Sequence, residues 1–126
     1  MKVLLTGADG FLGTNITHEL LNRGHQVSAF LQPGRPAGLL SGLDIEKIPG
    51  DILDPAQIGE AVRGCDALIH AAANTSIWPS RSPFIRRVNI EGTRNVIDAA
   101  IDAGIKRMVY IGTANTFGFG TRDVPG

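Results

Sequence analysis

Residues 6–13 read TGADGFLG and follow the short apolar run Val3 to Leu5. This run predicts a strand buried on both faces, and the apolar residues after the stretch recur at helical spacing. In such a turn Gly7 permits the tight change of direction, Gly10 lets the backbone approach a pyrophosphate, and Gly13 lets the helix pack closely on the sheet. The helix N-terminus adds main-chain amides that donate hydrogen bonds to an anion. The stretch therefore predicts an anion-binding turn between the first strand and the first helix.

Outward from this turn, short apolar runs alternate with longer amphipathic segments. Strands are expected at residues 3–5, 27–31, 45–48, 67–70 and 106–111, and helices at residues 11–21, 55–63 and 82–103. Residues 32–42, rich in Gly and Pro, are expected to form a loop. Strands separated by helices pair in parallel through right-handed crossovers. The alternation predicts an α/β fold, a Rossmann-type doubly wound parallel sheet of order 3-2-1-4-5, as one domain over residues 1–126.

The composition favours a globular protein without a strong summed charge. Apolar residues make up 43% of the chain, and twelve basic residues balance twelve acidic ones. We therefore expect neither nucleic acid nor a membrane as a partner. Cys65 is the single cysteine, and the first apolar run is too short for a signal peptide, which favours a cytoplasmic protein. No pair of histidines has ligand spacing with a carboxylate or Cys65, so no metal is expected.

The longest expected helix, residues 82–103, carries an apolar stripe at strict i, i+4 spacing. The stripe consists of Phe84, Val88, Gly92, Val96 and Ala100. The small residue Gly92 indicates that a neighbouring element approaches the helix closely at this point. His70, at the end of a buried strand, is interpreted as a core residue with satisfied hydrogen bonds.

Four further stretches accompany the glycine turn in order along the chain. They read GDILD at 50–54, HAAA at 70–73, VNIEGTRNV at 88–96 and VYIGTANTFG at 109–118. With the GxxGxxG spacing of the turn, they resemble the extended branch of the short-chain dehydrogenase/reductase superfamily, the NAD-dependent epimerase/dehydratase family. The resemblance covers essentially the whole chain. Residues 73–78 and 112–118 look most similar to dihydroflavonol reductase and hydroxysteroid dehydrogenase members.

The resemblance implies a dinucleotide site at the carboxyl ends of the strands. Asp51 would accept a hydrogen bond from the exocyclic amine of adenine, beside the backbone of Ile52, and Asp54 is better interpreted as a helix cap. The small side chains of the alanine run would let the cofactor lie against the backbone, with core packing as the alternative. Asn89 resembles a helix asparagine that supports the active site in relatives. The other implied cofactor-binding residues are Thr6, Gly7, Gly10, Phe11, Leu12, Gly13, Ala71, Ala72 and Ala73.

The end of the second expected strand bears on the choice between NAD and NADP. An acidic residue there would bind the ribose diol of NAD and repel a 2′-phosphate. The strand instead ends at Gln32, and no acidic residue lies between Glu19 and Asp44. Arg35 follows in the loop, where its guanidinium would make charge-assisted contacts to a 2′-phosphate. We expect NADP in preference to NAD, with a solvated loop charge as the alternative for Arg35.

The catalytic part of the resemblance is incomplete in this sequence. The superfamily moves a proton with a Tyr-x-x-x-Lys pair on the helix after the fifth strand. The one tyrosine, Tyr110, lies in a strand pattern and has Ala114 four residues later, so the pair is expected beyond Gly126 and the fold is expected to stop before that helix. Thr113 matches the family's Ser/Thr that hydrogen-bonds the substrate oxygen, with the start of a turn as its alternative.

Residues after the fourth strand are candidate substrate contacts, namely Asn74, Thr75 and Trp78. The sequence thus predicts the NAD(P)(H)-binding domain of an oxidoreductase that reduces a carbonyl or oxidises an alcohol by hydride transfer. The alternatives are a sugar-nucleotide epimerase or dehydratase, or a non-catalytic dinucleotide-binding sensor. The resemblance also implies a homodimer through the 82–103 helix.

Overall fold

A five-stranded parallel sheet forms the centre of the computed structural model, which describes residues 1–35, 38–76, 78 and 82–113. Its strands are β1 (Lys2–Thr6), β2 (Gln26–Leu31), β3 (Glu46–Pro49), β4 (Ala67–His70) and β5 (Arg107–Tyr110). They lie in the order β3-β2-β1-β4-β5, and every neighbouring pair is parallel. The predicted fold and strand order are confirmed.

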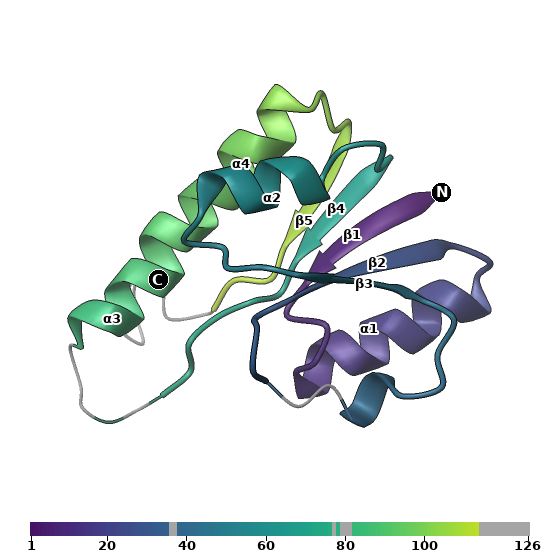
Figure 1. Cartoon of the computed structure of the whole chain (residues 1–126), viewed down its shortest axis with the longest axis horizontal. Helices are drawn as coiled ribbons and strands as arrows, with labels where there is room; N and C mark the ends of the chain where they lie inside the picture. Colours follow the sequence, from purple (N-terminus) through teal and green to yellow (C-terminus); the bar gives the residue numbers. More distant parts are fainter. Residues whose placement is uncertain (36–37, 77, 79–81, 114–126) are drawn as a thin grey trace, which may run out of the picture.

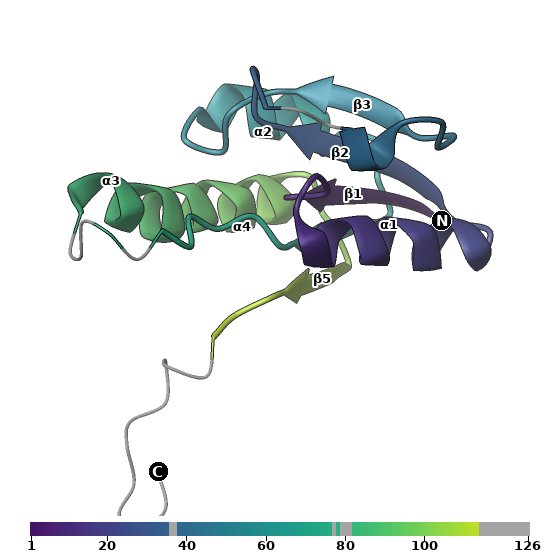
Figure 2. The same cartoon turned by 90° about the horizontal axis from the view of Figure 1, so that it is seen from below.

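Helices cover both faces of this sheet (Figure 1). They are α1 (Phe11–Asn22), α2 (Pro55–Ala61), α3 (Pro83–Arg86) and α4 (Thr93–Asp102), with a π-helical segment η2 (Arg87–Gly92) joining α3 to α4 and a 3₁₀ turn η1 (Gly38–Leu40) after β2. Figure 2 shows that α3, η2 and α4 form one continuous rod. Among the described residues, no helix has both the length and the apolar character to cross a bilayer.

Two apolar clusters fill the layers, one on each face of the sheet. Leu4 of β1 packs with residues of α2 and α4, such as Ile58 and Val96. Its neighbour Leu5 packs in the other cluster, which α1 borders through Leu20. Because successive strand residues face opposite sides, a central strand flanked by helices on both faces must be apolar throughout. This is why β1 reads as an unbroken apolar run.

The segment 32–42 differs from its prediction as a loop. It contains the 3₁₀ turn η1, and Leu40 at the end of that turn is fully buried in the cluster beside α1. Its side chain packs in the same cluster as Leu5 and Val27, and the Gly and Pro content of the segment gave no signal of this long-range contact.

The stripe on the long helix is buried only in its second part. Gly92, Val96 and Ala100 are buried, whereas Phe84 is 52% exposed and Val88 is partly exposed. A Cβ on Gly92 would lie 2.7 Å from Cδ1 of Ile52, so the predicted close approach at this glycine is present. The first part of the rod extends beyond the strand ends, so Val88 packs only partly against the core and Phe84 is exposed (Figure 1).

Candidate functional site

The glycine loop lies between β1 and α1, as the sequence predicts. Gly7 has a φ of 73°, and a Cβ there would lie 2.7 Å from the amide nitrogen of Ala72. A Cβ on Gly13 would overlap the carbonyl oxygen of Gly7, so Gly13 allows α1 to pack against the loop itself. Gly10 begins α1 without a side-chain cap, and its amide donates to the Gly7 carbonyl at 3.1 Å. The loop therefore closes by backbone-to-backbone contacts that side chains would block.

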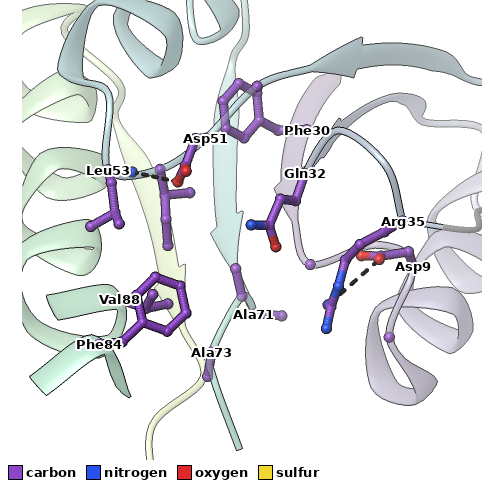
Figure 3. A pocket seen from close by; sticks show the side chains of 15 residues that line it. Asp9, Phe30, Gln32, Arg35, Asp51, Leu53, Ala71, Ala73, Phe84 and Val88 are labelled. Carbon is purple, nitrogen blue, oxygen red and sulfur yellow. Dashed lines mark hydrogen bonds and ion pairs between the residues drawn. The ribbon is translucent and has the colours of Figure 1, made fainter. Parts of the chain in front are cut away.

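A pocket opens beside this loop at the carboxyl ends of the strands (Figure 3). Its lining includes nine of the predicted cofactor-site residues, Gly7, Gly10, Gln32, Arg35, Asp51, Ile52, Ala71, Ala72 and Ala73. Six further lining residues were not predicted from the sequence as cofactor-binding, namely Asp9, Phe30, Gly50, Leu53, Phe84 and Val88. The predicted residues from four separate segments are thus brought together around one cavity.

The two sides of the pocket differ in chemistry. Figure 3 shows Asp9, Gln32 and Arg35 on one side, and Phe84 and Val88 across from them. The first side offers charges and hydrogen-bonding groups, whereas the second offers apolar surface beside the Asp51 carboxylate. Such a pocket suits a ligand with a planar apolar part and a polar or charged part.

Arg35 on the polar side is paired within the pocket. Its Nη1 atom lies 3.8 Å from Oδ2 of Asp9, and the side chains are 63% and 11% exposed, respectively. Arg35 was predicted as a site residue from the sequence, whereas Asp9 was not. The available signal was the acidic residue inside the glycine loop itself, because that loop and the end of β2 meet at the same edge of the sheet.

Asp54 is a helix cap, as expected, whereas Asp51 lies in the pocket. Asp54 caps α2, because its Oδ1 accepts from the amides of Ala56 at 2.9 Å and Gln57 at 3.3 Å. Asp51 lies in the pocket and accepts from the Leu53 amide at 2.9 Å. The carbonyl of Ile52 accepts from Asn95 of α4 at 2.9 Å, which ties this pocket turn to the helix.

Thr6 and His70 do not line the pocket but make hydrogen bonds that hold its alanine residues in place. Both are fully buried, and Oγ1 of Thr6 lies 2.6 Å from Nδ1 of His70 and accepts from the Ala72 amide at 3.3 Å. The other ring nitrogen of His70 lies 3.0 Å from Oγ1 of Thr93. Burial lowers the pKa of His70 to about 4, so its imidazole is neutral at pH 7. His70 is a core residue with satisfied hydrogen bonds, as predicted. Thr6 does not line the cavity but positions the alanine wall, the segment Ala71, Ala72 and Ala73 that does.

Asn89 also acts on the loop after β4. Its Oδ1 accepts from the Asn74 amide at 2.8 Å, and its Nδ2 donates to the Asn74 carbonyl at 3.0 Å. This pair of bonds fixes the chain as it leaves Ala73. Asn89 belongs to the π-helical segment η2, a distortion that is frequent at functional sites.

The remaining predicted residues lie outside the pocket lining. The Phe11 side chain is 86% exposed and that of Leu12 is 48% exposed, so only their main-chain amides are placed at the start of α1. Trp78 is 83% exposed, and Thr75 and Thr113 are also exposed. Residues 114–118 of the predicted active-site entrance lie outside the described residues. Within the described residues, no cluster of three or more His, Cys, Asp or Glu side chains could hold a metal ion.

A sequence model of the NAD dependent epimerase/dehydratase family matches residues 3–126. The chain belongs to this family. The predicted resemblance is confirmed, because this match includes the glycine loop, the pocket residues and the long helix.

Several relatives in the NAD-dependent epimerase/dehydratase family are named reductases or dehydrogenases. The chain is 39% identical over its full length to a 2-alkyl-3-oxoalkanoate reductase of Stenotrophomonas maltophilia, covering 37% of that protein. It is 35% identical over 90% of its length to a putative dihydroflavonol 4-reductase of Synechocystis, covering 33% of it. It is 33% identical over 98% of its length to a 3-beta-hydroxysteroid dehydrogenase of Mycolicibacterium neoaurum, covering 34% of it. The chain spans about a third of the length of these relatives.

Solved structures of the superfamily share the fold. A short-chain dehydrogenase/reductase superfamily protein from Agrobacterium tumefaciens with bound NAD matches with a TM-score of 0.79 and 30% identity, over 99% of this chain and 38% of that one. A UDP-glucose-4-epimerase from Stenotrophomonas maltophila, with bound NAD and formylated UDP-arabinopyranose, matches with a TM-score of 0.82 and 26% identity, over 98% of this chain and 39% of that one. Dinucleotide binding thus occurs in structural neighbours on both the dehydrogenase and the epimerase side.

Proposed function

We propose that residues 1–126 form the NAD(P)(H)-binding domain of an oxidoreductase that reduces a carbonyl or oxidises an alcohol. The observation that carries the proposal is the pocket bounded by an uncapped helix start, where no described side chain caps α1 and its first turn holds no acidic residue. Amides at such a helix start bind phosphate groups. The reductase and dehydrogenase names of the relatives support the reaction class.

In this proposal each side of the pocket holds one part of the dinucleotide. The amides of Phe11 and Leu12 hold the pyrophosphate, and Gly10 leaves room for it to approach the backbone. Asp51 and the Ile52 backbone bind adenine beside the apolar surface of Phe84 and Val88. The alanine wall lets the cofactor pass close to the backbone, toward residues at the end of β5.

The bound nicotinamide would supply the hydride in carbonyl reduction or accept it in alcohol oxidation, and the residues of this chain would orient the reactants. Thr113 would donate a hydrogen bond to the substrate oxygen, and Asn89 would position the loop that carries Asn74. Asn74, Thr75 and Trp78 are proposed substrate contacts. Tyr110 lies in β5 with its ring stacked on His70 at a centroid distance of 5.5 Å, so it is not the proposed proton donor.

We propose NADP(H) as the preferred cofactor. The basis is the absence of an acidic residue at the end of β2, together with Gln32 and Arg35 on the polar side of the pocket. The expected result is tighter binding of NADPH than of NADH, measured as the change in dihydronicotinamide fluorescence on titration into the protein. Equal or weaker binding of NADPH would remove this preference.

The binding site itself is tested by comparing two glycine variants. In Gly10→Ala the methyl group occupies the approach of the pyrophosphate, and we expect both dinucleotides to bind about tenfold more weakly. Gly59→Ala is the matched control, because Gly59 lies in α2 with open space at its Cβ position. Equal affinity in both variants would contradict the proposed site.

A sugar-nucleotide epimerase remains the second candidate, supported by the match to the UDP-glucose-4-epimerase structure. Turnover by a protein that carries both this domain and the Tyr-x-x-x-Lys pair distinguishes the two, because an epimerase interconverts UDP-sugars without net consumption of NAD(P)H. A dinucleotide sensor would bind the cofactor and turn over neither type of substrate.

The outer surface of the long helix supports a proposed homodimer. Ile97 and Ile101 of α4 are 38% and 68% exposed, and Ile90 of η2 is 49% exposed. Ile97→Glu is expected to shift a dimer to monomer in size-exclusion chromatography with light scattering, and a monomeric wild type would refute the proposal.

We also propose a reducing, cytoplasmic setting, in keeping with the single cysteine, Cys65.

A further inference from the structure

The ion pair between Asp9 and Arg35 differs from an ordinary surface pair. Both residues line the pocket, and the Asp9 side chain is only 11% exposed. By contrast, Arg23 and Glu19 on α1 pair at 2.6 Å with side chains 70% and 58% exposed. Asp9 is therefore a shielded carboxylate that faces a cavity beneath an exposed guanidinium.

The pair lies where a dinucleotide would present the 2′ position of its adenosine ribose. In sheets of this type, that position falls between the glycine turn and the end of the second strand. Asp9 belongs to the turn, and Arg35 follows β2 on the same side of the pocket as Gln32 (Figure 3). A phosphate monoester at this point would bring about 1.5 to 2 negative charges beside the Asp9 carboxylate.

We propose that Asp9 and Arg35 act in opposite directions on cofactor choice: Asp9 weakens binding of the 2′-phosphorylated dinucleotide, and Arg35 offsets this effect. The inference rests on the proposed function, since it concerns the same pocket. Repulsion by Asp9 opposes attraction by Arg35, so NADP(H) is still preferred, but by less than Arg35 alone would give. In the absence of a 2′-phosphate, the Asp9 carboxylate accepts a hydrogen bond from the ribose hydroxyl.

This arrangement places the acidic discriminating residue in the glycine turn instead of at the end of β2. The ratio of NADPH to NADH affinity is therefore smaller than Arg35 alone would give. The selectivity between NADP(H) and NAD(H) depends on both residues, and a substitution at either one should change it.

The experiment measures the ratio of NADPH to NADH affinity by fluorescence titration. The ratio isolates the 2′-phosphate, because the two ligands are otherwise identical. We expect Asp9→Asn to raise the ratio about tenfold and Arg35→Gln to lower it about tenfold. Both changes should shrink at high ionic strength. Glu19→Gln, which breaks the surface pair on α1, is the matched control and should leave the ratio unchanged.

A ratio in Asp9→Asn that is unchanged within about twofold, or lowered, overturns the inference. If Asp9→Asn does not fold, Arg35→Gln decides, because the exposed Arg35 side chain contributes little to stability. An unchanged ratio in Arg35→Gln then overturns the inference. Wild-type protein that binds neither dinucleotide overturns the proposed function instead, and that outcome is visible before any variant is made.

Discussion

The two sides of the pocket are built in different ways. At the glycine loop, main chain packs on main chain, and a single added methyl group at Gly7 or Gly13 would collide with backbone atoms. Across the cavity, Phe84 and Val88 contribute partly exposed side chains from the start of the long helix. The first side is fixed by steric exclusion, whereas the second is surface that substitution can reshape. Variants on the two sides should therefore differ in kind as well as in magnitude.

The strongest test of the steric side is Gly13→Ala. Its Cβ would overlap the Gly7 carbonyl oxygen, and that backbone cannot give way without opening the glycine loop. We expect the free energy of unfolding to fall by about 4 kcal/mol, at the upper end of overpacking effects, and dinucleotide binding to be lost. Urea denaturation measures the change. Gly59→Ala should by contrast be neutral or stabilising by about 0.5–1 kcal/mol, and equal stability of the two variants would contradict the steric argument.

The stability of the protein should depend on pH through His70, which lies next to the glycine-loop side of the pocket. Burial lowers the pKa of His70 to about 4 in the folded protein, compared with 6.5 for an ordinary histidine. Between these values the unfolded chain binds a proton that the folded protein excludes, so stability falls as the pH drops. From pH 7 to pH 4 we expect His70 to account for a loss of about 3 kcal/mol in the free energy of unfolding.

His70→Gln isolates this contribution from those of the carboxylates. Its amide keeps both a donor and an acceptor between Thr6 and Thr93 but does not titrate in this range. The difference in unfolding free energy between pH 7 and pH 4 should shrink by about 3 kcal/mol in the variant. An identical pH dependence in the wild type and the variant would show that His70 is not the titrating group.

Phe84→Ala tests the opposite side of the pocket. Phe84 is 52% exposed, so its removal should change stability by less than about 1 kcal/mol. Loss of apolar surface from the proposed adenine site should weaken dinucleotide binding about five- to tenfold. Ile101→Ala, on an exposed part of α4, is the control and should leave affinity unchanged. Weakening of the same size in both variants would place the effect outside the pocket.

The glycine-loop side was predictable from sequence because its causes are local. The apolar run, the glycine spacing and the following helix are contiguous, and the alternation of elements leaves few ways to order the strands. The other side was not predictable in the same way. Phe84 and Val88 continue the spacing of Val96 and Ala100, so the sequence does not separate them from the buried part of the stripe, and the position of the strand ends shows that they line a cavity.

Contacts between loops that are distant in the sequence were also not predicted. Asp9 and Arg35 are 26 residues apart in the sequence and meet only because β1 and β2 are neighbours in the sheet. Leu40 was assigned to a loop because Gly and Pro surround it, and its burial depends on surface supplied by other segments. Charge and hydropathy along the chain do not encode such partners. The strand order does, once it is known, bring these two loops to a common edge.

The π-helical segment η2 has a consequence for how the long helix can change in length. A π turn holds one residue more than an α turn, so deleting a single residue within Arg87–Gly92 would restore an α-helical turn. The registers of α3 and α4 would both be kept, with Val96 and Ala100 in the core and Phe84 at the cavity. A one-residue deletion at this point thus offers evolution a way to move Asn89 and the cavity wall while leaving the folded interior intact.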